Sequence, residues 1–243
     1  MPNRFWNYNR TAFFGQFAVL SGAAVAAVLA QCLVFKYGTG WVILTGASPQ
    51  RIAALWNDTR QALSSTGILV APLVALWLGT QLAASARRTP DPAARWWLAG
   101  ILQLASALVS AYLLAFTLLA VLTGTIGRWL ILELIPLALA ASAVTYGLGY
   151  CVALEMEDRR KALGVSLAVL VGYVLVVVGA NQVFAVRLPF IWNLLITPPH
   201  HNSPDVVNGS REFPLLRLVG CLLAALAFFI AARGRRGGTH VLP

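Results

Sequence analysis

The run ALGVSLAVLVGYVLVVVGANQVFAV, residues 162–186, holds 25 residues without a single charged side chain. A second charge-free run, AVLSGAAVAAVLAQCLVF, covers residues 18–35. Because an α-helix rises about 1.5 Å per residue, about 20 apolar residues cross a hydrocarbon core about 30 Å thick. Both runs are therefore long enough to span a membrane as helices.

The composition of the whole chain agrees with these two runs. Of its 243 residues, 59% are hydrophobic and only 11% are charged, with a mean hydropathy of +0.75. A soluble domain needs a larger polar surface, and a membrane barrel would show alternating segments of about ten residues. The sequence predicts an all-α polytopic membrane protein. We expect one transmembrane domain over residues 1–243, with six spans at about 12–35, 65–86, 96–122, 129–154, 163–186 and 214–232.

The distribution of Lys and Arg predicts the orientation. The N-terminus, the loop after span two, the loop after span four and the tail together carry eleven basic residues in short segments. The longer loops on the other side carry six. The positive-inside rule then places both termini in the cytoplasm. The net charge of +10 is explained by topology and by membrane lipid head groups, so we expect no nucleic-acid partner. The preference for arginine over lysine, sixteen to two, together with the abundant alanine and leucine, indicates a high-GC bacterial genome. We therefore expect a multi-pass protein of the bacterial inner membrane.

One short stretch, CVALEMEDRRKALG at residues 151–164, concentrates the charge. It contains Glu155, Glu157, Asp158, Arg159, Arg160 and Lys161. We expect a cytoplasmic turn between spans four and five, whose bases hold the orientation. Two readings of its acids stay open: they pair locally in a solvated turn, or they contact a cytoplasmic partner.

The loop ARRTPDPAARWW, residues 86–97, is the second candidate contact surface. Its prolines break a helix, and Asp91 between them suits the cap of a new short helix. Arg95, Trp96 and Trp97 are then expected to anchor span three at the membrane interface. The loop is either a tight connector or a short helix presented to a partner. The partner-coupling candidates on the two loops are Arg87, Arg88, Asp91, Arg95, Glu155, Glu157, Asp158 and Arg159.

Three further segments are expected to lie at a membrane surface. The aromatic and basic residues of RFWNYNRTAFF, residues 4–14, predict an interfacial segment before span one. Ser48 and Pro49 are expected to begin a short amphipathic helix on the outer face. The apolar segment 188–199, broken by Pro198 and Pro199, predicts a re-entrant outer half-helix. The following His200 and His201 are better explained by loop polarity than by a metal site, so none is predicted.

Polar residues within the spans are the candidates for a transport pathway, because charge in lipid is costly. Glu133 and Arg217 lie near the outer ends of spans four and six. They either snorkel or pair across an outer vestibule, with the amides of Asn181 and Gln182 as further candidates. The small residues of ALAASAVTYGLGY, residues 138–150, predict close helix packing.

The stretches TGILVAPLVALWLGTQLAASARRTPDPAARWW, residues 66–97, and GYCVALEMEDRRKA, residues 149–162, resemble the membrane subunit of an ABC-2-type ABC transporter. That resemblance implies a pair of six-span permease subunits, as a homodimer or a heterodimer, above separate cytoplasmic ATPase subunits. The loop at 87–95 and the N-terminal segment would couple to the ATPase, and the 188–199 segment would help to close the pathway. The expected function is ATP-driven export of an amphipathic molecule such as a lipid, peptide or drug. This chain would be no enzyme and bind no cofactor, since ATP and Mg would sit on the ATPase.

Two other classes of protein are alternatives to a transporter. A non-transporting accessory or scaffold subunit of a larger membrane complex suits the low number of charges in the spans equally well. An integral membrane enzyme would need a catalytic cluster, and the sequence offers neither a nucleophile elbow nor a GxxxxGK[ST] nucleotide-binding loop. The substrate, the direction of transport and the type of dimer are left open, since pathway-facing and lipid-facing positions are both Ala, Leu and Val.

Overall fold

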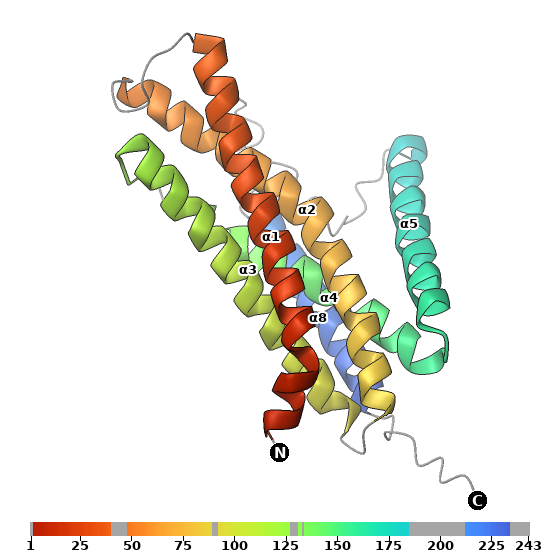
Figure 1. The fold of residues 1–243 in the computed structure, drawn as a ribbon. Helices are drawn as coiled ribbons and strands as arrows, with labels where there is room; N and C mark the ends of the chain where they lie inside the picture. Colours follow the sequence, from red (N-terminus) through yellow and green to blue (C-terminus); the bar gives the residue numbers. More distant parts are fainter. Residues whose placement is uncertain are drawn as a thin grey trace, which may run out of the picture. The chain divides into compact units, whose positions relative to one another are not determined.

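The computed structural model describes residues 2–39, 48–88, 92–126, 131–132, 134–184 and 212–233. These residues form six helices, with no strand among the described ranges (Figure 1). The helices are α1 (Pro2–Thr39), α2 (Pro49–Arg87), α3 (Ala93–Thr123), α4 (Leu134–Glu155), α5 (Arg159–Phe184) and α8 (Glu212–Arg233). The prediction of a helical protein is confirmed for this part of the chain.

Four helical segments are long and apolar enough to cross a membrane. They are Phe13–Leu33, Pro49–Arg87, Ala93–Thr123 and Leu134–Glu155. In α8, the apolar stretch Leu218–Arg233 is shorter than a span. These segments agree with the first four predicted spans. The count of six spans and the side on which the termini lie remain predictions.

Helix α2 differs from the expected arrangement of a short outer helix followed by a separate span. It runs over 39 residues from Pro49 to Arg87, about 58 Å at 1.5 Å per residue. The expected start is confirmed: the side chain of Ser48 accepts a hydrogen bond from the Arg51 amide at 3.4 Å. The helix continues because no proline interrupts residues 50–71, and because Leu63 and Ser64 are buried by packing. Tertiary packing here overrides the weak helix propensity of the Ser-Ser-Thr-Gly stretch at 64–67.

Helix α1 is likewise continuous from Pro2, where a separate interfacial segment was expected before span one. Only the part from Phe13 to Leu33 meets the criteria of a membrane span. The residues before it therefore extend the same helix, and no break in the backbone separates the two parts.

The chain divides into two compact units, and the division passes through α2, α3 and α4. Unit 1 contains residues 1–71 and 103–139. In this unit the first half of α2 packs on the second half of α3. The Trp56 and Phe116 rings meet edge-on at 5.4 Å, and the Tyr112 hydroxyl donates to the Leu63 carbonyl at 3.3 Å. Tyr112 also closes the space above Gly67, which leaves no room there for a side chain.

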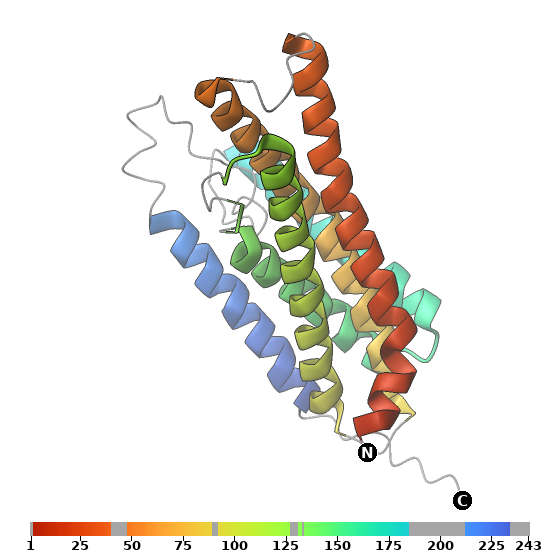
Figure 2. The ribbon, with the colours of Figure 1, turned by 60° about the vertical axis from the view of Figure 1, so that its left-hand side comes forward.

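Unit 2 contains residues 72–102 and 140–243, and the positions of all the partner-coupling candidates fall within these ranges. Figure 2 shows the end of α8 beside the start of α3, and the rings of Trp97 and Phe229 join them at 5.2 Å. The turn that joins α4 to α5 follows at residues 156–158. The packing of unit 2 therefore determines where this turn is held.

Candidate partner-docking surface

The charged turn, residues 155–161, joins the end of α4 to the first turn of α5. Asp158 begins α5 as its N-cap: its Oδ1 accepts from the Arg160 amide at 2.8 Å, and its carbonyl accepts from the Ala162 amide at 2.9 Å. The first amides of a helix have no partner within the helix, and an Asp cap supplies one. One of the acids predicted from the sequence therefore has a structural role in starting a helix.

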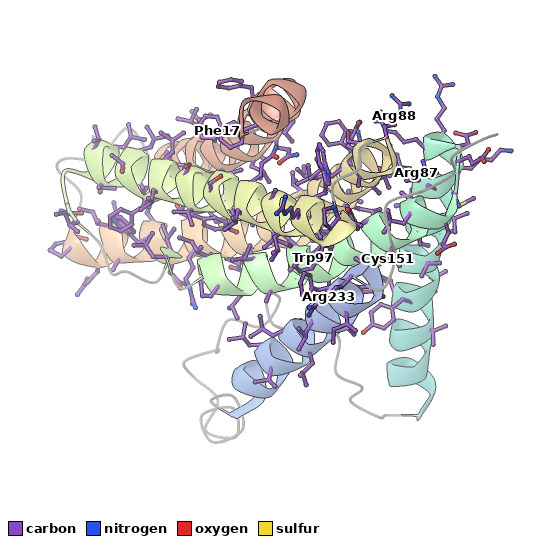
Figure 3. The ribbon with its side chains drawn as sticks, turned by 90° about the horizontal axis from the view of Figure 1, so that it is seen from below. Phe17, Arg87, Arg88, Trp97, Cys151 and Arg233 are labelled. Atoms are coloured by element: carbon purple, nitrogen blue, oxygen red, sulfur yellow. The ribbon has the colours of Figure 1, made fainter. Side chains whose placement is uncertain are left out.

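Arg87 fixes the charged turn to the end of α2. Its guanidinium donates to the carbonyl of Met156 and, at 3.2 Å, to the carbonyl of Glu157. Met156 and Glu157 follow the end of α4, so their carbonyls lie outside that helix, and a charged guanidinium is a strong donor to them. Figure 3 shows Arg87 and Arg88 between the end of α2 and the start of α5. Arg87 therefore holds together two segments that lie about 70 residues apart in the sequence.

The remaining coupling candidates in the described residues are exposed. They are Arg88, Arg95, Glu155, Glu157 and Arg159. Partial desolvation and, secondly, the neighbouring charge of Arg160 lower the pKa of Arg159. An arginine stays protonated under such a shift, so the surface remains charged. Asp91 lies outside the described residues.

Behind the charged turn, two buried tyrosines of α4 hold the start of α3. The Tyr146 hydroxyl donates to the Trp96 carbonyl at 3.4 Å, and the Tyr150 hydroxyl donates to the Ala93 carbonyl at 2.7 Å. The two tyrosine rings stack at 5.8 Å, and Trp97 meets Tyr146 edge-on at 5.8 Å. A hydroxyl buried among apolar groups needs a partner, and both of these hydroxyls have one.

One glycine in α2 and one in α4 let the backbones of these two helices approach closely near Tyr146 and Tyr150. A Cβ added to Gly79 would meet the Tyr146 carbonyl oxygen, and one added to Gly149 would meet the Leu76 carbonyl oxygen. Both obstacles are backbone atoms, which cannot move aside as a flexible side chain can. Small residues at helix contacts are typical of membrane helices. The two glycines therefore make the α2–α4 contact possible.

Helix α8 packs on the same part of α4. The Phe228 ring fills the space above Gly147, and the Cys151 thiol donates to the Phe228 carbonyl at 3.5 Å. We call the set Gly79, Trp97, Tyr146, Gly149, Tyr150 and Phe228 the junction. It joins α2, α3, α4 and α8 next to the charged turn.

The sequence predicted close packing along residues 138–150, and the structure buries Ala138, Ser142, Tyr146 and Tyr150 there. The tyrosines were not predicted from the sequence as the residues that bind α3. The spacing of Tyr146 and Tyr150 within TYGLGY, residues 145–150, is a signal that could have indicated this role. Trp96 and Trp97 were expected as interfacial anchors. That expectation is wrong, since both are buried, at 5% and 7% exposure. Contact with Tyr146 and Phe229 removes Trp97 from the surface.

The other predicted sites lie at residues whose side chains are not described. Glu133, His200, His201 and the 188–199 segment are outside the described residues. Arg217 belongs to α8, and Asn181 and Gln182 belong to α5, as backbone positions only. The pair of Glu133 with Arg217 therefore stays a prediction. Within the described ranges, no three His, Cys, Asp or Glu side chains gather as metal ligands would.

Comparison of the chain with models of protein families, with curated proteins and with solved structures finds no match. We therefore infer the function from the residues of the charged turn and the junction.

Proposed function

We propose that this chain is the membrane subunit of an ATP-driven ABC-type transporter whose ATPase is a separate cytoplasmic chain. The observation that carries the proposal is the link between the charged turn and the membrane helices. Arg87 holds the turn to α2, and the junction behind it joins α2, α3, α4 and α8. A partner that bound this turn would be connected directly to four helices.

The division of roles within the turn follows from its contacts. Arg87 and Asp158 are occupied by backbone groups, so they shape the surface. Glu157 and Arg88 are exposed and charged, which suits complementary contacts with another protein. Movement of the ATPase would then pass from these two residues through Arg87 into α2.

The chemistry of transport divides in the same way between the two chains. The sequence has no nucleotide-binding loop of the GxxxxGK[ST] type, so ATP and Mg²⁺ are assigned to the partner. This chain would supply the pathway, with a second permease subunit, for an amphipathic molecule. The apolar faces of its helices suit such a substrate, because an amphipathic molecule needs contact with both apolar and polar surface.

The test is affinity purification of the tagged chain in mild detergent, with identification of the bound proteins and an assay of vanadate-sensitive ATP hydrolysis. We expect a stoichiometric ATPase with the wild-type chain. The variant Arg88→Gln/Glu157→Gln should recover at least tenfold less of it, while Arg51→Gln recovers the wild-type amount. Arg51 is a matched control, since it is exposed and lies at the opposite end of α2.

Two results would contradict the proposal. One is a stable complex that contains no ATPase, which would favour a scaffold subunit of a larger membrane assembly. The other is equal recovery of the ATPase with both variants, which would place the contact elsewhere on the chain.

A further inference from the structure

Basic side chains gather where α2 ends and α5 begins. Arg88, Arg159, Arg160 and Lys161 are all exposed. The hydrogen bonds from Arg87 to the carbonyls of Met156 and Glu157 bring the end of α2 against the turn that leads into α5. Arg88 is thereby held close to the turn that leads into Arg159, Arg160 and Lys161, and all four exposed cations belong to unit 2.

This arrangement is electrostatically unfavourable for the chain alone. The first turn of α5 has no acidic residue, and it carries three cations at the end of a helix where the backbone itself is partially positive. Asp158, the N-cap of α5, offsets only one of these positive charges. Glu155 and Glu157 lie on the α4 side of the turn. Over positions 87–88 and 155–161 together, the basic residues, Arg87 included, still outnumber the acidic ones by two. An external anion would relieve this excess.

The surface next to the cations is apolar and exposed. Residues four apart on a helix share a face, so Val165 and Val169 follow Lys161 along one side of α5. Val165 is 42% exposed and Val169 49% exposed. Leu167 and Val171 lie on the same side of α5 as Arg160, and their side chains are exposed to a similar extent. A cationic end continuous with an exposed apolar face matches a molecule that has an anionic head and an apolar tail.

We infer that the start of α5, with Arg88, is a selective binding site for an anionic phospholipid. Arg160 and Lys161 contact the phosphate, with Arg88 and Arg159 beside them, and an acyl chain lies along Val165 and Val169. Guanidinium groups suit this role because their fork of donors matches the oxygens of a phosphate. The inference is independent of the proposed transport function, since a scaffold subunit could hold the same lipid.

The experiment measures the melting temperature of the delipidated, full-length chain in detergent as lipid is added. We expect phosphatidylglycerol to raise the melting temperature by several degrees and phosphatidylcholine to raise it by less than half as much. In Arg160→Gln/Lys161→Gln the difference between the two lipids should fall at least twofold. The control Arg51→Gln/Arg233→Gln removes the same charge at other helix ends and should keep the wild-type difference.

A second variant guards against misfolding of the neutralised chain. Arg159→Lys/Arg160→Lys keeps the charge and should keep most of the preference for phosphatidylglycerol. Equal shifts with the two lipids in the wild-type chain would overturn the inference, as would an unchanged preference in Arg160→Gln/Lys161→Gln. A full shift produced by soluble glycerol phosphate would also overturn it, because the ligand would then be a free phosphate ester and not a lipid.

Discussion

Arg87 shows how one side chain can join two distant parts of a membrane helical bundle. Its guanidinium satisfies carbonyls of Met156 and Glu157, which follow the end of α4. In the sequence, Arg87 and Arg88 look alike, as two bases in a short loop. The structure separates them, since Arg87 is partly buried and bonded whereas Arg88 is exposed. The sequence therefore could not assign their separate roles, which depend on a contact between residues 70 positions apart.

Replacement of Arg87 by Gln should destabilise the chain by about 2 kcal/mol, the cost of losing hydrogen bonds from a charged group. Arg88→Gln should change the stability by less than about 0.5 kcal/mol, as is usual for an exposed residue. The measurement is thermal unfolding in detergent. Equal effects of the two variants would show that the contacts of Arg87 do not hold the turn.

Gly149 is the residue at which the α2–α4 contact is most sensitive to size. A methyl group there meets the Leu76 carbonyl, and overpacking of this kind costs about 1–3 kcal/mol. Gly149→Ala should therefore lower the melting temperature clearly. Gly164→Ala is the matched control, because nothing lies within 4 Å of its added Cβ and alanine favours a helix. A stable Gly149→Ala variant would contradict the close approach of α2 and α4.

At the scale of the helix, Asp158 begins α5 through its hydrogen bond to the Arg160 amide. Asp158→Ala should cost about 1 kcal/mol of stability, whereas Asp158→Asn should cost little, since Asn is an equally good cap. Unfolding measurements on both variants check this. If Asp158→Asn is as unstable as Asp158→Ala, the charge of Asp158 matters more than its cap.

The predicted elements differ from the observed ones where packing acts against local signals. The long apolar runs predicted helices at the right places, because membrane helices are specified by length and hydropathy. The fusion of the outer helix with span two was not predictable from residues 64–67, whose propensity favours a break. The burial of Trp96 and Trp97 was missed for a related reason. An Arg-Trp-Trp sequence at a helix start is typical of an interface anchor, and only the contacts with α4 and α8 reveal that it is covered.

For the whole molecule, the orientation predicted by the positive-inside rule can be tested with two described turns. Thr125 follows α3 and Glu157 follows α4, so a spanning α4 places them on opposite sides of the membrane. In a chain whose cysteines are replaced, Thr125→Cys should react in intact cells with a membrane-impermeant maleimide. Glu157→Cys should react only after the cells are opened. The reverse pattern would place the charged turn outside the cell and end its assignment to a cytoplasmic partner.

We propose that a separate ATPase binds the charged turn, and cross-linking in living cells tests this contact. A photo-reactive amino acid is placed at position 157, or at position 51 as the control. We expect one major cross-linked product from position 157, containing an ATP-binding protein, and no such product from position 51. Products from position 157 that contain only membrane subunits, or an ATPase captured equally from position 51, would contradict it.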